Sequence, residues 1–404
     1  MTATRVPPGR GASPRIARAI NDRLALRLLQ QEGPLTAGQL KELTGMSRPS
    51  VADLVERLQE SGLIEVVGES GATRRGPNAR VYGIVATRAH VAGLDVRIES
   101  IAVEIADLLG RTVARGDLPV PPDADPQRLV EDGIALLQET AATAGVEALH
   151  TVAFGAPGLV DPVTGRLSPT GALPSWHGDL VDEVRKRVGV PVLLENEVNL
   201  AAVAEQRTGA AAGDDETFVL LWLGSGVGAA LMLDGRLRRG MSGGAGEVGF
   251  LPLSGNGGLP TATDCDNGFH GLAGSRGVCA LARAHGLTAA AGEDAAAAAG
   301  AVRSAAAAPP GSAGALFLDE LAARIAVGVA AICAVVDPGR VVLAGEVGQA
   351  GGKALAGRVA ERLALLSPLR TLVQPTAVDG AAILRGAVIT AMDAAQDAVF
   401  TPPE

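Results

Sequence analysis

Residues 36–62 read TAGQLKELTGMSRPSVADLVERLQESG, and this stretch decides the organisation of the N-terminal part of the chain. Thr36 and Gln39 have the spacing of a capping box, in which each side chain satisfies a backbone donor at a helix start. The pattern predicts a short helix that runs to about Leu43. The segment Thr44-Gly45-Met46 then breaks this helix.

A second helix is predicted directly after the break. Ser47 is expected to cap it, and Pro49 lies in its first turn, where a missing N–H costs little. Gly62 supplies the C-terminal stop. Apolar residues recur at i, i+3, i+4 and i+7 and predict one buried face: Val51, Leu54, Val55 and Leu58. Two helices joined by such a short turn form a helix-turn-helix.

Further elements on both sides extend this motif. A preceding helix is expected over 16–30, with an inward row of Ile20, Leu24 and Leu28. Two β-prone runs, 63–67 and 79–85, follow the motif and flank a polar loop. We therefore predict a winged helix-turn-helix over residues 15–88.

The outward face of the second helix is polar in its first turn, where a recognition helix meets base edges in the major groove. Arginines in the loop between the two strands would lie at a wing tip, near a phosphate or the minor groove. The candidate DNA contacts are Thr36, Ser47, Arg48, Pro49, Ser50, Asp53, Arg74, Arg75 and Arg80. The alternative is a solvated helical hairpin with no role in DNA binding.

Charge is divided unevenly along the 404 residues, whose net charge is −9. Residues 1–88 contain 13 Lys and Arg against 8 Asp and Glu, whereas residues 89–404 contain 22 against 36. A basic head on an acidic body is typical of a DNA-binding module fused to a second domain. Residues 1–14 are expected to form a disordered basic arm.

Composition narrows the class of protein. The chain is 47% apolar and 20% charged, and its three cysteines are not clustered, which argues against a disulfide framework. The N-terminus lacks the apolar segment of a secretory signal, and no apolar run has the length of a membrane span. We expect a cytoplasmic protein without a membrane partner.

Residues 89–404 are predicted to form an α/β body, because segments with strand character alternate with segments of helical character. A long apolar helix is expected over 315–336, a strand over 341–344 and a last helix over about 380–396. Several predicted strands end in glycine-rich turns, where ligands usually bind.

The order of these motifs resembles the ROK family (repressors, open reading frames and sugar kinases). The resemblance covers the chain from about Ile16 and rests on GAPGLVDPVTG at 155–165, PSW at 174–176, PVLLENEVNLAAVAE at 191–205, LGSGVGAAL at 223–231, GEVGF at 246–250 and DPGRVVLAGEVG at 337–348. It implies an actin-like (ribonuclease H-like) two-lobed body with a ligand in the cleft. Within that body, the resemblance implies that Gly155, Gly158, Asn196, Glu197, Glu247 and Phe250 bind the effector.

Other functions remain open for three of these residues. Asn196 and Glu197 have the alternative role of capping the helix that follows them. Glu247 has the alternative of being an ordinary surface acid.

The chain departs from the family's kinases at the nucleotide loop. Those kinases carry D-x-G-x-T after the first strand of the body, and this chain has DVRIE at 95–99. Side chains at these positions block the approach of ATP phosphates. Glu197 stands where the kinases place an aspartate as general base, and its longer side chain displaces the carboxylate. We therefore expect no enzymatic activity and no cofactor.

The chain also departs from the zinc-binding members. Phe250 replaces a histidine ligand, and of the family's cysteine run only Cys265 remains. Cys265, Asp266 and His270 could form a partial site, but a closed zinc site needs a full ligand set, so we expect a loop held by packing and no metal.

The combined expectation is a transcriptional repressor of carbohydrate genes that is modulated by a sugar-type effector. A homodimer or homotetramer is expected, because two-fold symmetry matches a palindromic operator in double-stranded DNA. Two alternatives stay open: an active sugar kinase with a DNA-binding head, and a ligand-independent DNA-binding protein with a degenerate pocket.

Overall fold

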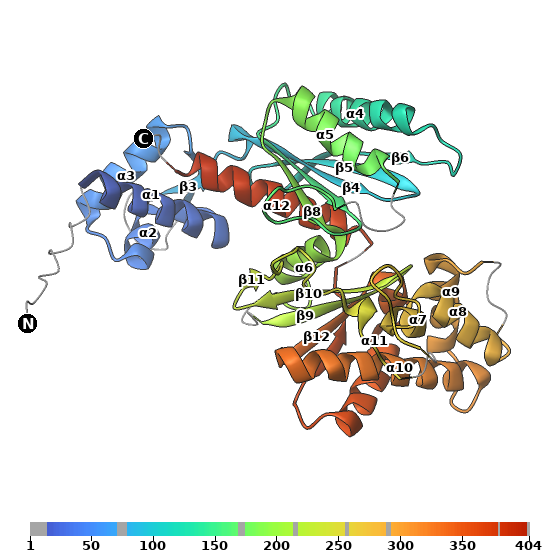
Figure 1. Ribbon diagram of the computed structural model, residues 1–404. Coiled ribbons are helices and arrows are strands. Elements are labelled where there is room, and N and C mark those ends of the chain that lie inside the picture. The colour runs from blue at the N-terminus through green and yellow to red at the C-terminus, as the bar shows by residue number, and fades with distance from the viewer. Residues whose placement is uncertain are drawn as a thin grey trace, which may run out of the picture.

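The computed structural model describes residues 14–70, 79–168, 174–212, 217–254, 258–287, 292–378 and 380–401 (Figure 1). A small N-terminal head precedes two lobes, and each lobe is built on a five-stranded sheet. The α/β composition, the winged helix and the two-lobed body expected from the sequence are confirmed.

The head has the winged-helix arrangement. It consists of α1 (Pro14–Gln31), β1 (Leu35–Thr36), α2 (Ala37–Thr44), α3 (Arg48–Glu60), β2 (Ile64–Ser70) and β3 (Ala79–Ile84). The three strands form an antiparallel sheet in the order β1-β3-β2. The 3-10 turn Ala86–Arg88 then leads into the body.

Local capping explains where α2 and α3 begin and end. The Gln39 N–H donates to Thr36 Oγ1 at 3.2 Å, and the Thr36 N–H donates to Gln39 Oε1 at 2.9 Å, so the predicted capping box is confirmed. Gly45 ends α2 with φ of 70°, a conformation that suits glycine. The predicted buried row of α3 is also confirmed: Val51, Leu54, Val55 and Leu58.

The predicted inward face of α1 is wrong for Ile20 and Leu24, whereas Leu28 is partly buried and packs on the core. Ile20 is 59% exposed and Leu24 is 40% exposed, and the buried row consists of Ala25, Leu26 and Leu29. The sequence of α1 is apolar on more than one side, so helical period alone does not select the face. Asp22 forms an ion pair with Arg57 of α3 at 2.5 Å, and it shares a face with the residues three, four and seven positions later.

The first lobe contains β4 (His90–Val96), β5 (Ser100–Asp107), β6 (Thr112–Pro119), β7 (Thr151–Ala156) and β8 (Val192–Asn196), in the order β6-β5-β4-β7-β8. The first three strands are antiparallel neighbours, and β7 and β8 run parallel to β4. Helices α4 (Pro126–Thr143) and α5 (Trp176–Val188) pack together beside this sheet. Their apolar residues share one core with the sheet.

The second lobe contains β9 (Phe218–Leu223), β10 (Val227–Leu233), β11 (Arg236–Leu237), β12 (Arg340–Ala344) and β13 (Leu372–Pro375), in the order β11-β10-β9-β12-β13. Its helical elements are η2 (Val248–Phe250), α7 (Phe269–Ala273), α8 (Ser275–Ala284), α9 (Ala295–Ala306), α10 (Ala313–Val336) and α11 (Gly345–Leu366). These helices and one face of the sheet share a second core. No helix within the described ranges has the length and apolar character needed to cross a lipid bilayer.

Helices α6 (Glu197–Thr208) and α12 (Ala382–Val399) pack against each other where the two lobes meet. Two glycines allow the close approach of α12. A β-carbon at Gly386 would overlap the backbone of Leu200, and one at Gly93 would lie 2.7 Å from the backbone nitrogen of Val388.

The far end of α12 reaches the head (Figure 1). Asp397 forms an ion pair with Arg23 of α1, and Gln396 Nε2 donates to the carbonyl oxygen of Leu108 at 2.7 Å. Phe400, which is 4% exposed, belongs to the same apolar core as Leu26. Head, first lobe and α12 therefore share one continuous core.

The glycine contact between α12 and α6 yields a stability prediction. Gly386→Ala is expected to lower the free energy of unfolding by about 1–3 kcal/mol, because the new methyl group meets backbone that cannot move aside. Gly357→Ala is the control, since Gly357 lies in α11 with open space around it and alanine favours helix by up to about 1 kcal/mol. Thermal melts of both variants test this, and equal shifts would contradict the close approach.

Candidate functional site

The first turn of α3 presents polar groups to solvent. Ser47, Arg48, Pro49 and Ser50 are all exposed. Ser47 caps the helix, with its hydroxyl oxygen 2.8 Å from that of Ser50. Arg48 is the first residue of α3, so its side chain lies exposed at the start of that helix.

Asp53, expected on the same outward face, is engaged within the head. Its carboxylate forms an ion pair with Arg57 one turn later on α3. Arg57 also donates to both carboxylate oxygens of Asp22, at 2.5 and 3.4 Å, and its hydrogen bond with Asp22 is the largest cause of its raised pKa. The chain of Asp53, Arg57 and Asp22 fixes α3 against α1.

The other candidate DNA contacts lie around the wing and the start of α2. Arg80 is exposed on β3, opposite Glu69 of β2. Thr36 is half-buried, and its hydroxyl is used by the capping box. Arg74 and Arg75 lie outside the described residues.

In the body, Asn196 connects the end of β8 to the turn that follows β7. Its Nδ2 donates to the carbonyl oxygen of Gly158 at 2.9 Å, and its Oδ1 accepts from the N–H groups of Val198 and Asn199 at 2.8 and 3.2 Å. Asn196 is thus the N-cap of α6, the alternative role left open by the sequence. A β-carbon at Gly155 would lie 2.7 Å from Ile383, so Gly155 allows the packing of α12.

Four charged side chains meet between the lobes, and we call them the interlobe charge group: Asp95, Arg97, Glu197 and Glu346. Arg97 Nε donates to Asp95 Oδ2 at 2.9 Å within the first lobe. Its Nη1 donates to Glu346 Oε1, on α11 of the second lobe, at 3.3 Å. Arg97 therefore bridges the two lobes by its ion pairs.

Burial is the main cause of the raised carboxylate pKa values in this group, and the excess of carboxylates over cations adds to the increase. Asp95 is 6% exposed, and its Oδ1 has no hydrogen-bond partner. Burial raises the pKa of Asp95, and the charge of Arg97 opposes that effect. Burial also raises the pKa of Glu197 to about 7, and Asp95 and Glu346 add to the increase while Arg97 opposes it.

The ion pair of Arg97 and Glu346 fills space between two turns. Arg97 belongs to the turn between β4 and β5, and Glu346 lies against Gly224 of the turn between β9 and β10. A β-carbon at Gly224 would overlap the Glu346 carboxylate. Arg97 thus stands where the family's kinases carry the glycine of their D-x-G-x-T loop, as the sequence indicated. The sequence identified Arg97 at this place but not its partner Glu346.

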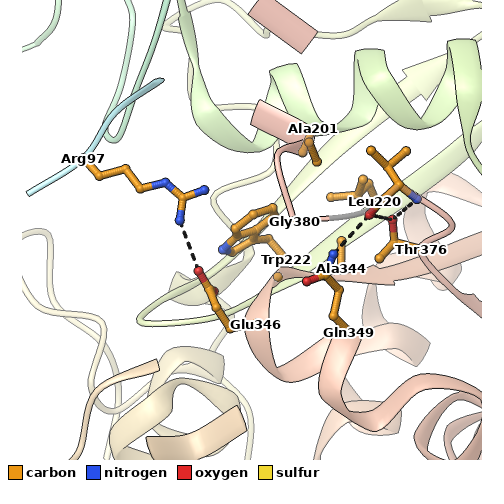
Figure 2. Close-up of a pocket in the computed structure, with 12 residues that line it drawn as sticks. Arg97, Ala201, Leu220, Trp222, Ala344, Glu346, Gln349, Thr376 and Gly380 are labelled. Carbon is orange, nitrogen blue, oxygen red and sulfur yellow. Dashed lines mark hydrogen bonds and ion pairs between the residues drawn. The ribbon is translucent and has the colours of Figure 1, made fainter. Parts of the chain in front are cut away.

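A cavity of about 210 Å³ lies next to this ion pair (Figure 2). Its polar side chains are Arg97, Glu346, Gln349 and Thr376, and Trp222 supplies an aromatic wall. Further lining residues come from α6, β9, β12, α11, α12 and the segment before α12: Ala201, Leu220, Ala344, Gly345, Val378, Gly380 and Ala382. Glu197 lies one turn before Ala201 on α6 and therefore on the same helical face.

Glu247 and Phe250 lie elsewhere in the second lobe. Glu247 directly precedes η2 and Phe250 is its last residue, and η2 packs on β10 and α7. Burial raises the pKa of Glu247, and Phe250 is 37% exposed. Neither residue lines the cavity beside Trp222.

The cysteine and histidine residues singled out by the sequence do not assemble into a ligand set. His270 Nε2 lies 3.8 Å from Asp266 Oδ1, and burial lowers the pKa of His270. Within the described ranges, no group of three metal-binding side chains is present. His177 is buried and stacks on Trp176 with ring centroids 4.0 Å apart, which is a packing role.

The raised pKa of Glu197 predicts a pH-dependent stability effect. Between pH 4.5 and about 7 the folded state retains a proton that the unfolded state has released, so ionisation of Glu197 lowers stability as pH rises through that range. Glu197→Gln is expected to raise the melting temperature at pH 8 and to have little effect at pH 5. Equal shifts at both pH values, measured by thermal denaturation, would contradict the burial of this carboxylate.

Comparisons with known proteins identify families for both the body and the head of the chain. Residues 91–393 match a family model described as ROK family, and residues 21–76 match one described as MarR family. The xylose repressor of Bacillus subtilis is 25% identical over 59% of this chain and 62% of its own length. The transcriptional dual regulator NagC of Escherichia coli is 26% identical over 59% of this chain and 58% of its own length. The alignments thus cover less than two thirds of these relatives.

Solved structures show the same fold. A ROK family transcriptional regulator, described as a homolog of the E. coli MLC protein, has a TM-score of 0.73 at 18% identity and covers 95% of this chain and 98% of its own. A ROK family glucokinase from Streptomyces griseus, solved with glucose and AMPPNP, has a TM-score of 0.62 at 25% identity and covers 76% of this chain and 100% of its own. Because the family model matches most of the sequence, the chain belongs to the ROK family.

Proposed function

We propose that this protein is a DNA-binding transcriptional repressor of carbohydrate uptake or metabolism genes, modulated by a sugar-type effector in its body. The observation that carries the proposal is the winged-helix head, whose recognition helix exposes Ser47, Arg48 and Ser50. The head is basic and the body is acidic, which suits a division between DNA binding and another task. Relatives named xylose repressor and N-acetylglucosamine repressor support the same function.

The DNA partner is a double-stranded operator. One winged helix reads few base pairs, so two or four copies of the chain would act together on a palindromic site. Arg48 would contact a base edge, and Arg80 and the wing would contact phosphates. Asp53 would act indirectly, because its ion pair with Arg57 orients α3.

The body would act as a sensor and not as a kinase. Arg97 and Glu346 fill the region in which a kinase of this family would receive nucleotide phosphates, and three carboxylates there would repel a phosphate group. Glu197, at the position of the general base, is tied into that charge group. The similarity to a glucokinase supports the rival kinase function, and the filled phosphate region opposes it.

A sugar-type effector would bind in the cleft between the lobes. Glu197 is the candidate residue best placed there, because it faces the lobe junction beside Arg97. Asn196 and Gly158 would position the surrounding backbone, with Gly155 permitting α12 to pack. Glu247 and Phe250, which the family resemblance also implies, line no part of the cavity beside Trp222. A protein that regulates DNA without any ligand is the rival function favoured by the structural use of Asn196.

Helix α12 provides the route from the cleft to the head. Gly380 and Ala382, at its start, line the cavity, and Asp397 near its end forms an ion pair with Arg23. An effector that shifts α12 relative to the lobes would change the orientation of the head. Such a coupling typically changes affinity by about 1–3 kcal/mol.

Arg48→Ala tests the DNA-binding part of the proposal. The operator sequence would first be obtained by selecting bound duplexes from a random pool with the wild-type protein. The variant is expected to lose about 1–3 kcal/mol of affinity for the selected sequence, because a base contact is removed, while salt-dependent nonspecific binding persists.

Arg128→Ala is the control for Arg48→Ala, since Arg128 is also an exposed arginine and lies on α4, far along the chain from the head. The control is expected to bind the selected sequence as the wild type does. An Arg48→Ala variant with unchanged sequence preference would remove the assignment of α3 as the recognition helix.

Phe400→Ala tests the connection between α12 and the head. The loss of this buried ring is expected to cost about 3–5 kcal/mol and to free the head, so calorimetry should show a separate transition for the head at lower temperature. Phe317→Ala, in the core of the second lobe, should lower the stability of that lobe without freeing the head. Identical single transitions in both variants would contradict a shared core.

A further inference from the structure

The cavity beside Trp222 belongs to no site that the sequence motifs predicted. It opens between the first lobe, which contributes Arg97, and the second lobe, which contributes Trp222, Glu346 and Gln349. At about 210 Å³ it lies below the usual range of pockets for drug-sized ligands, roughly 300–1,000 Å³. A ligand of this cavity is therefore small.

The lining has the chemistry of a site for a compact polar molecule with an apolar face. Figure 2 shows the Trp222 indole between the Arg97–Glu346 pair on one side and Gln349 with Thr376 on the other. An indole face packs against the C–H face of a sugar ring. Planar carboxylate, guanidinium and amide groups exchange hydrogen bonds with neighbouring hydroxyls.

Two of the polar groups at the Gln349 end are already held in place. Gln349 Nε2 donates to the carbonyl oxygen of Val378 at 3.0 Å, which leaves its amide oxygen to accept from a ligand. Thr376 Oγ1 donates to Glu205 Oε2 at 2.6 Å. These bonds orient the groups before a ligand arrives, which lowers the entropic cost of binding.

Charge determines which ligands fit. Arg97 is shared by Asp95 and Glu346, with Glu197 on the neighbouring face of α6, so carboxylates outnumber the cation. A phosphate ester brings roughly −1.5 to −2 charges at pH 7. It would have to enter this negative region away from bulk water, where like charges repel strongly.

We infer that a small uncharged sugar binds in the cavity beside Trp222, and that this cavity excludes sugar phosphates. We make this inference on the basis of the proposed function, because it assigns the position and the charge of the effector. The ligand would touch Gly380 and Ala382 at the start of α12, the helix that reaches the head. Glu247 and Phe250 have no such contact, since η2 packs on β10 and α7.

The tryptophan content of the chain supplies a direct readout. Trp176 and Trp222 are the two tryptophans in the sequence, and Trp176 is buried in the core of the first lobe. The full chain would be titrated with xylose, glucose and N-acetylglucosamine, and with glucose 6-phosphate and N-acetylglucosamine 6-phosphate. At least one uncharged sugar is expected to change the emission saturably, with a Kd at least about 10-fold below that of its phosphate. Trp222→Phe should abolish the emission change.

Matched variants locate the site by calorimetry, which does not depend on tryptophan emission. Gln349→Ala is expected to raise the Kd of the bound sugar at least about 10-fold, while Glu247→Gln should leave it within about 2-fold. Glu346→Gln should narrow the difference between sugar and sugar phosphate, because it removes a negative charge from the cavity wall.

The outcomes separate this inference from the proposed function. Strong loss of binding in Glu247→Gln with none in Gln349→Ala would overturn the inference and leave a sugar-responsive repressor intact. Tighter binding of a phosphate, or no saturable binding of any uncharged sugar, would also overturn it. Failure of the proposed function would give a different result: the wild-type chain would show no sequence-selective DNA binding.

Discussion

The ion pair of Arg97 with Glu346 determines which groups occupy the space between the two lobes. It joins the turn after β4 in the first lobe to the start of α11 in the second lobe. Within the first lobe, Arg97 Nε also donates a hydrogen bond to Asp95 Oδ2 at 2.9 Å. Isolated ion pairs of this kind contribute little net stability, because desolvation offsets their attraction. This pair matters because of where it lies. Its side chains fill the space between two turns and form a polar wall of the cavity beside Trp222.

Helix α12 extends the effect of that region to the DNA-binding head. It packs against α6 and the first lobe through glycine contacts that leave no room for a β-carbon, as at Gly386. Because this contact is close-packed, a displacement of α6 or the first lobe would move α12 as well, since there is no empty space to take it up. At its other end, Phe400 shares an apolar core with α1. The head is therefore packed onto an element that begins at the interlobe cavity.

Features set by residues within one or two helical turns could be predicted from the sequence, whereas contacts between residues far apart in the chain could not. The capping box at Thr36, the buried row of α3 and a last helix shifted by two or three residues all follow from patterns within one or two turns. The face of α1 was wrong because the helix is apolar on more than one side, and packing in the head buries Ala25, Leu26 and Leu29. The loss of a glycine loop at Arg97 was visible, but its partner lies 249 residues away. Asn196 was recognised as a possible cap, and its bond to Gly158 could not be inferred from either residue alone.

Nucleotide binding tests the central claim, that Arg97 and Glu346 have converted a kinase cleft into a sensor. The most direct measurement is calorimetric titration of the full chain with AMPPNP and magnesium, in the presence of glucose, beside an assay of ADP release from ATP. The account predicts no saturable heat and no hexose-dependent ADP. Saturable nucleotide binding accompanied by hexose-dependent ADP release would contradict it.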